Sequence, residues 1–232
     1  VRACQQEKRK LLRMRLLLLL RLSAYMGIPA SAFVFAAAKE IAGVFTQLTF
    51  KGEEAAVLTL KAGSFLIFLV QTVILLLIFF WRCEEKRVIV FSAGAAFFAE
   101  IVFLVVLKIC GVGITMNVWP LDVMGVVFLV TLYLAGRSGA AAGVDPSFLT
   151  EDILIAVCAA GAAIPLMLLN DYMLAILPAP LAFLVMLAVF WILFVILSLF
   201  LHAADLRNLH RIPGGGWILN LAMVLGVMER ED

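Results

Sequence analysis

Two long apolar runs separated by six residues are the feature that most constrains this chain. Residues Ala62 to Trp81 form 20 consecutive uncharged positions, and Val88 to Leu107 is a run of 20 with a single ionisable side chain, Glu100. At 1.5 Å per residue, a helix of this length spans ~30 Å, the thickness of the hydrocarbon core of a bilayer. The runs therefore predict a pair of transmembrane helices joined by a short turn.

The turn and the overall composition agree with a membrane protein. Residues 82–87 read Arg-Cys-Glu-Glu-Lys-Arg, and the positive-inside rule places such a turn in the cytoplasm. The chain is 65% hydrophobic and 15% charged, with a mean hydropathy of +1.14, whereas soluble domains have about 45–50% apolar and about 25% charged residues. So little polar surface cannot cover a water-facing globule, and we expect an all-α integral membrane protein.

Four further apolar runs complete a predicted bundle of six transmembrane helices, in a single polytopic membrane domain that covers residues 1–232. Within this domain, residues 1–21 form a basic cytoplasmic segment that holds seven of the 18 Lys and Arg residues. Pro29 is expected to kink the first span, and the small residues of the fifth span favour close helix packing. The predicted spans cover residues of about 16–38, 62–81, 88–107, 119–136, 153–171 and 181–201.

Three segments of the chain are less clear than the spans, and two of them allow an alternative interpretation. The leucines before Arg21, with Ala36-x-Ala38, also fit a cleavable signal peptide. The apolar patch from Ile41 to Phe50 is too short to span and is expected in the outer interface. Residues 202–232 are predicted to be a cytoplasmic tail with a short interfacial helix at Trp217 to Met228; a seventh span is the alternative.

The distribution of basic residues predicts the orientation. With six spans and both termini in the cytoplasm, 14 Lys and Arg residues lie inside and four outside. This asymmetry follows the positive-inside rule. We expect an integral protein of a bacterial cytoplasmic membrane, that is, a cell inner membrane, whose first partner is the lipid bilayer.

Glu100 is the most informative single residue. It lies near the centre of its span, where a carboxylate costs ~3 kcal/mol or more unless it faces a partner or water. A proton or cation relay or a substrate contact is the functional interpretation; a hydrogen bond that fixes helix packing is the alternative. Gln71, midway along the preceding span, is the expected partner.

Three further polar residues lie toward the predicted outer side. Asp122 lies at a depth that Glu100 could approach, although an acid in the first helical turn after Pro120 is the simpler interpretation. Asn170 and Asp171 end the fifth span. Glu100, Asp122 and Asp171 together could form an acidic vestibule that attracts cations, with solvated span-end acids as the alternative.

The remaining patterns exclude several function classes. The chain has no H-E-x-x-H, G-x-S-x-G or Walker motif and no C-x-x-C pair among its four cysteines, so no catalytic residue and no cofactor is predicted. His202 and Asp205 alone do not make a metal site, and no charge pattern points to nucleic acid. An enzyme is the least favoured class.

Two function classes remain. The preferred prediction is a small-molecule or ion transport component, a permease-like subunit that lacks its own ATPase and needs a protein partner subunit. The alternative is a membrane scaffold or assembly factor of an envelope complex that acts through helix contacts.

Overall fold

The computed structural model describes residues 2–46, 53–111, 118–136 and 148–201. Every regular element in these ranges is an α-helix, and six of the helices are long and apolar enough to cross a membrane. The predicted all-α membrane bundle is thereby confirmed. The helices are α1 (Arg2–Ala36), α2 (Ala38–Thr46), α3 (Glu53–Arg82), α4 (Lys86–Ile109), α5 (Val118–Gly136), α6 (Phe148–Ile176) and α7 (Ala179–Phe200).

Several helices are longer than the apolar runs that predicted them. The basic segment and the first span form one continuous helix, α1, in which the apolar part is Met14–Ala36. Helix α3 begins at Glu53, well before the predicted start at Ala62. Hydropathy reports only the part of a helix that lies in hydrocarbon, whereas the helical hydrogen bonds continue as the chain leaves it.

The segment after α1 forms a short helix that packs on other helices, and hydropathy alone did not predict this packing. The patch predicted to lie in the outer interface folds as α2, which follows a turn at Ala37 and packs against α3 and α7. Glu40 and Ala42 are fully buried by this packing. The predicted interfacial helix Trp217–Met228, with His202 and Asp205, lies outside the described residues, as does the end of the patch from residue 47.

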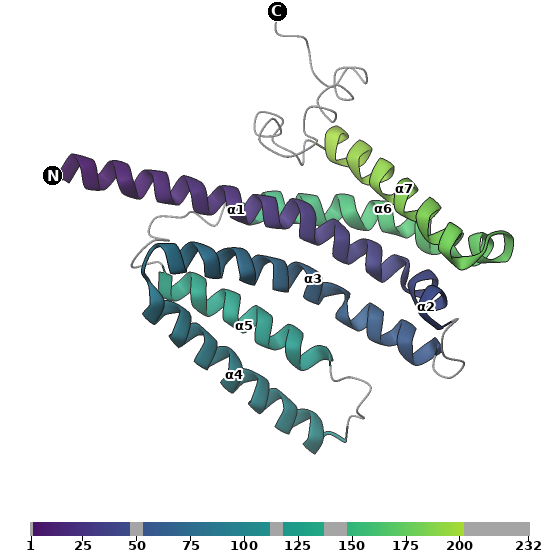
Figure 1. Ribbon diagram of the computed structural model, residues 1–232, viewed down its shortest axis with the longest axis horizontal. Helices are drawn as coiled ribbons and strands as arrows, with labels where there is room; N and C mark the ends of the chain where they lie inside the picture. Colours follow the sequence, from purple (N-terminus) through teal and green to yellow (C-terminus); the bar gives the residue numbers. More distant parts are fainter. Residues whose placement is uncertain (1, 47–52, 112–117, 137–147, 202–232) are drawn as a thin grey trace, which may run out of the picture.

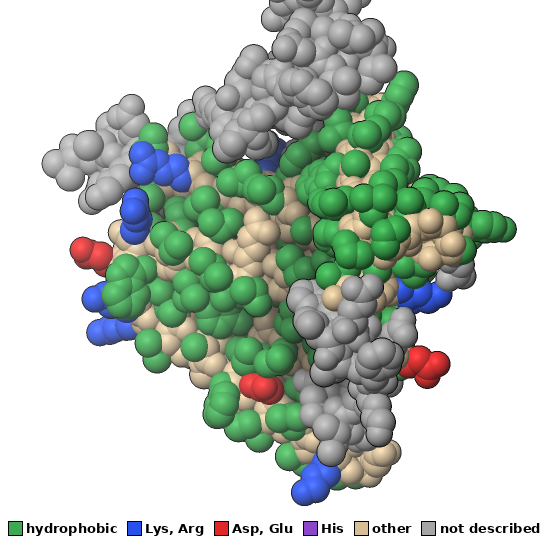
Figure 2. All heavy atoms as spheres, turned by 45° about the vertical axis from the view of Figure 1, so that its right-hand side comes forward, with side chains coloured by type: hydrophobic (Ala, Val, Ile, Leu, Met, Phe, Trp, Pro, Cys, Tyr) green, Lys and Arg blue, Asp and Glu red, His purple; other side chains and the backbone are tan. Residues whose placement is uncertain are grey.

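The six long helices pack in a definite lateral order. Helix α1 packs against α3 and α6, α5 packs between α3 and α4, and α7 packs against α6. Helix α4 thus lies at one edge of the bundle, far from α7 (Figure 1). Hydrophobic side chains cover most of the face shown in Figure 2. Such a surface fits a lipid environment.

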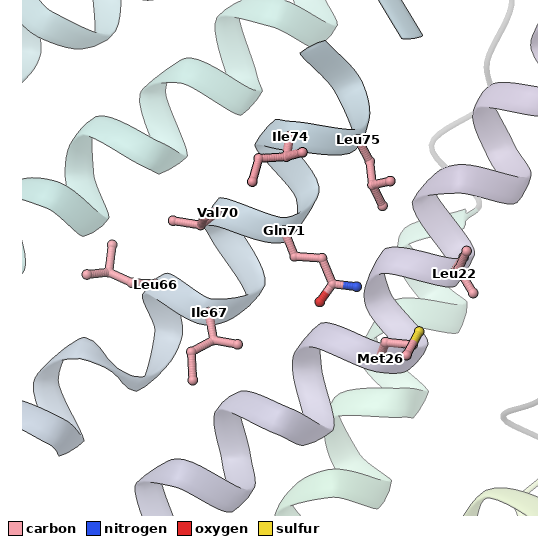
Figure 3. A pocket seen from close by; sticks show the side chains of 8 residues that line it. All are labelled: Leu22, Met26, Leu66, Ile67, Val70, Gln71, Ile74 and Leu75. Atoms are coloured by element: carbon pink, nitrogen blue, oxygen red, sulfur yellow. The ribbon is translucent and has the colours of Figure 1, made fainter. Parts of the chain in front are cut away.

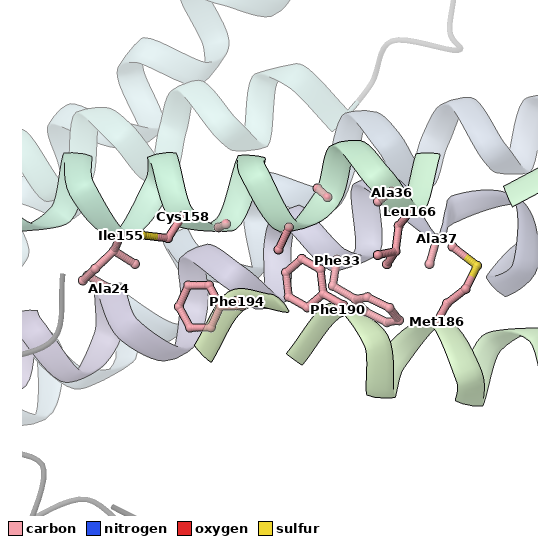
Figure 4. Packing of buried hydrophobic residues seen from close by; sticks show 13 residues of the cluster. Ala24, Phe33, Ala36, Ala37, Ile155, Cys158, Leu166, Met186, Phe190 and Phe194 are labelled. Atoms are coloured by element: carbon pink, nitrogen blue, oxygen red, sulfur yellow. The ribbon is translucent and has the colours of Figure 1, made fainter. Parts of the chain in front are cut away.

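The larger hydrophobic cluster joins α1, α6 and α7 (Figure 4). The small residues of α6 that were expected to permit close packing, among them Cys158 and Ala162, are completely buried in it. Their small volume lets the α6 backbone approach large aromatic side chains. Phe33 of α1 and Phe190 of α7 lie with ring centroids 5.4 Å apart.

A polar seam joins α1 to α3. Ser23, Gly27 and Ser31 are spaced by four residues, so they share one face of α1. The hydroxyl groups of Ser23 and Thr72 are hydrogen-bonded at 2.5 Å, and the Phe68 backbone N–H donates to the Ser31 hydroxyl at 3.2 Å. This is the small-xxx-small pattern of closely packed membrane helices. Our sequence analysis did not identify it, although its spacing is visible in the chain.

Candidate functional site: polar side chains within the membrane

Glu100 lies on the edge helix α4. The side of α4 that packs inward holds Ser92 and Ala96, and Glu100 is only partly buried, one turn beyond Ala96. Among the described residues no hydrogen bond or ion pair reaches the Glu100 carboxyl group. The structure therefore places a partly buried carboxyl group on an edge span, beside the side of α4 that packs on α5.

Gln71 lies on the side of α3 that faces α1. Its side-chain amide points toward α1 near Met26 (Figure 3), and its Oε1 lies 3.1 Å from where a β-carbon on Gly27 would be. Within the described residues this amide makes no hydrogen bond. The expected pairing of Gln71 with Glu100 does not occur within the described part of the chain, because α5 packs between α3 and α4 and Gln71 faces α1.

Gln71 also lines a groove of about 720 Å³ between α1 and α3. The other lining side chains are apolar, and Met26, Val70 and Ile74 are each about half exposed. We call this surface the α1–α3 groove; it is lined by Leu22, Met26, Leu66, Ile67, Val70, Gln71, Ile74 and Leu75. It is an apolar trough with one amide, and it lies between two of the candidate membrane spans.

Asp122 lies in the second turn of α5 and not in the first. Helix α5 begins at Val118, and its first turn holds no acid. The interpretation of Asp122 as a first-turn acid after Pro120 is therefore wrong, because the helix starts earlier than the Pro120 signal suggested. One carboxylate oxygen of Asp122 is buried and has no hydrogen-bond partner among the described residues.

Asn170 ties α6 to the end of α1. It is 5% exposed, and its Nδ2 donates to the Ala36 carbonyl oxygen at 3.4 Å. Its Oδ1 is buried without a hydrogen-bond partner in the described structure. Asp171 follows it in α6, but its side chain lies outside what the structure describes. Asn170 thus helps to hold the C-terminal end of α1 against α6.

Glu40 is a buried acid that the sequence analysis did not single out. It is 0% exposed on α2, and both carboxylate oxygens are buried. A signal was present in the chain, because Ile41, Ala42 and Val44 make the neighbouring positions apolar. Only the packing of α2 on α3 and α7 decides that Glu40 is inside.

The candidate side chains do not converge on one described cavity. Glu100 and Asp122 lie on the neighbouring helices α4 and α5, Gln71 faces α1, and Asn170 and Asp171 lie on α6, which packs against α1 and α7. In the described ranges, no three His, Cys, Asp or Glu residues are close enough to hold a metal ion. A second groove, of about 480 Å³ between α1, α3 and α6, is lined mainly by apolar residues.

Comparison with protein-family models, with curated proteins and with solved structures finds no match for this chain. Its function must therefore be argued from the geometry of the helices and of their polar side chains.

Proposed function

We propose that this multi-pass membrane protein is an assembly subunit that acts by binding other transmembrane helices. The observation that carries this proposal is Glu100, a carboxyl group within an edge span that makes no hydrogen bond to the described residues. A carboxyl group in hydrocarbon costs ~3 kcal/mol or more unless a polar partner or water meets it. A partner helix packed on α4 would supply the missing hydrogen bond and exclude lipid from Glu100.

The grooves support the same proposal. A permease binds a polar solute through several convergent polar groups, whereas the α1–α3 groove is aliphatic apart from Gln71. Apolar troughs along helix pairs are suited to the side chains of another helix. The membrane scaffold, the alternative in the sequence analysis, is therefore the function that the geometry favours.

A transport component remains the second candidate because of Asp122. One of its oxygens is buried and unpaired within the described structure, which is an arrangement that a transported proton or cation could satisfy. ATP-driven transport would require a partner, since no nucleotide-binding motif occurs in the chain, whereas transport coupled to a proton or cation gradient would not. Transport requires that Glu100 or Asp122 carries a proton or cation, whereas assembly requires only that Glu100 forms a hydrogen bond to a partner helix.

Photo-crosslinking in the native membrane tests the assembly proposal. A photoreactive amino acid at Ile101, 44% exposed on α4, is expected to capture a defined partner, and Glu100→Leu should abolish that capture. The control position is Ile192, 59% exposed on α7. Loss of capture with Glu100→Leu but not with Glu100→Gln supports a hydrogen-bonded helix contact. Equal capture at both positions, or no effect of Glu100→Leu, contradicts it.

The transport candidate predicts a different pattern. If Glu100 or Asp122 moves a proton or cation, then Glu100→Gln or Asp122→Asn abolishes proton- or cation-coupled uptake into proteoliposomes while the protein remains folded. In an assembly subunit both neutral variants keep their partner and proteoliposomes show no uptake above empty vesicles.

A further inference from the structure

Glu100 lies at the border between the packed side and the exposed side of α4, and exposed apolar side chains flank it. Phe97 and Leu104 lie three residues before and four residues after Glu100, hence on the same side of the helix, and they are 61% and 41% exposed. A β-carbon built on Gly94 would meet no atom within 4 Å. This border of α4 therefore presents a carboxyl group between two large apolar side chains, and the open Gly94 lies one turn before Phe97 on the exposed side.

The α1–α3 groove has the complementary arrangement. Its walls are aliphatic, and the amide of Gln71 is its polar group (Figure 3). An amide both donates and accepts hydrogen bonds, as a carboxylic acid does. A lipid acyl chain could fill the trough but would leave this amide without a partner, because acyl chains have no hydrogen-bonding group near the bilayer centre.

The two polar groups also lie at similar depths. The depth of each residue can be measured from the α3–α4 turn. Gln71 lies before Arg82, the last residue of α3, and Glu100 lies after Lys86, the first residue of α4. The rise per residue puts Gln71 ~16 Å and Glu100 ~21 Å from the turn, a difference of about one helical turn. Flexible Gln and Glu side chains can bridge such a difference. Copies of one membrane protein share an orientation, so this match in depth persists between molecules.

We propose that α4 of one copy packs into the α1–α3 groove of a second copy, with Glu100 hydrogen-bonded to Gln71 of that copy. Within one chain α5 packs between α3 and α4, so the pairing is available only between molecules. The contact uses different surfaces on the two copies, so it builds a ring or an open row. This inference rests on the proposed assembly function and names the partner of α4.

Cysteine cross-linking between two differently tagged copies tests this contact. With the native cysteines replaced, one copy carries Val70→Cys in the groove and the other carries Ile101→Cys on α4; both native residues are exposed, at 52% and 44%. Oxidation in the membrane is expected to link the two tags. Pairing Val70→Cys with Ile192→Cys, on α7, is the control and should give no link.

Substitutions at the two polar residues test the hydrogen bond. Gln71→Leu and Glu100→Leu are each expected to lower the linked fraction by about 3- to 20-fold, the range for one interhelical hydrogen bond in a membrane. When the two residues are exchanged, with Gln71→Glu in one copy and Glu100→Gln in the other, a carboxyl group again lies opposite an amide. The linked fraction should then stay near that of the parent pair. Glu100→Gln alone keeps a side chain that can hydrogen-bond to Gln71 and should still link. Size-exclusion profiles of each variant show whether it is folded.

Two outcomes overturn the proposed contact between α4 and the α1–α3 groove. One is the absence of the link between Val70→Cys and Ile101→Cys; the other is a link only between two copies of Ile101→Cys, which indicates a two-fold contact of α4 with itself. If the photo-crosslink from Ile101 still captures a different protein in a Glu100-dependent way, the assembly function stands and only the second copy as partner is excluded. If neither experiment gives a product, both proposals fail.

Discussion

At the scale of single residues, two glycines in similar sequence surroundings have different roles. A β-carbon on Gly27 would lie 2.9 Å from the Phe68 ring and 3.1 Å from the Phe68 α-carbon, whereas one on Gly94 meets nothing. Both glycines lie within apolar spans, and the sequence does not distinguish them. The close approach of α1 to α3 gives Gly27 its importance.

Gly27→Ala is therefore expected to destabilise the bundle, by about 1–3 kcal/mol, because the added methyl group must push α1 away from α3 or displace Phe68. The measurement is the midpoint of thermal unfolding in detergent. Gly94→Ala is the matched control and should leave the midpoint unchanged or slightly raised, since alanine favours the helix. Equal effects of the two substitutions would contradict the tight α1–α3 contact.

Cys83 gives a prediction about pH. It lies in the turn between α3 and α4, and partial burial, with a smaller contribution from the negative charge of Glu85, raises the pKa of its thiol. The thiolate is the reactive form, so alkylation at neutral pH should be slower than for free cysteine and should keep rising at more alkaline pH.

Glu85→Gln removes the smaller of these two causes. It should lower the pKa of the Cys83 thiol and so accelerate alkylation at neutral pH, as measured by mass spectrometry with Cys4, Cys110 and Cys158 replaced. An alkylation profile that Glu85→Gln leaves unchanged would argue against the influence of this carboxylate.

At the scale of helices, α6 is held by small residues on one side. Ala162 is 0% exposed between α1 and α7, while Ala160, two residues earlier, is exposed on the side of the second groove. The composition of the span predicted close packing, but composition alone does not say which alanines are inside. The rotation of α6 about its axis decides it.

Ala162→Leu is expected to overpack the α1–α6–α7 cluster and to lower stability by about 1–3 kcal/mol. Ala160→Leu adds the same volume at an exposed position and should be tolerated. Unfolding midpoints of the two variants in the same detergent provide the comparison. A larger loss for Ala160→Leu would mean that α6 is rotated differently in its packing.

At the scale of the whole molecule, the six spans and the distribution of basic residues define a topology that can be tested directly. With both termini in the cytoplasm, single cysteines at Gly52, Gly139 and Gly215 in a cysteine-free chain should react differently with a membrane-impermeant maleimide added from outside. Gly52→Cys is expected to react, whereas Gly139→Cys and Gly215→Cys should react only after the membrane is permeabilised. The reverse pattern would contradict the charge-based orientation.

The number and position of the spans in the described ranges were determined by the sequence itself. Bilayer thickness sets the length of an apolar helix, and backbone groups in hydrocarbon must be hydrogen-bonded within their own segment, so each span can be recognised along the chain without reference to its neighbours. The predicted spans at residues 88–107 and 119–136 accordingly lie within α4 and α5. Glu100, Gln71 and Asp122 were identified as candidates for the same local reason.

Only the tertiary structure decided which faces meet. In lipid, an apolar side chain is about equally favourable against another helix or against an acyl chain, so hydropathy does not encode the lateral order of the helices. That order directs Gln71 toward α1 and away from α4, buries Glu40 where α2 packs on α3 and α7, and leaves Glu100 on the edge helix α4. These placements depend on side-chain shape and close backbone contact between distant segments, such as Gly27 against Phe68.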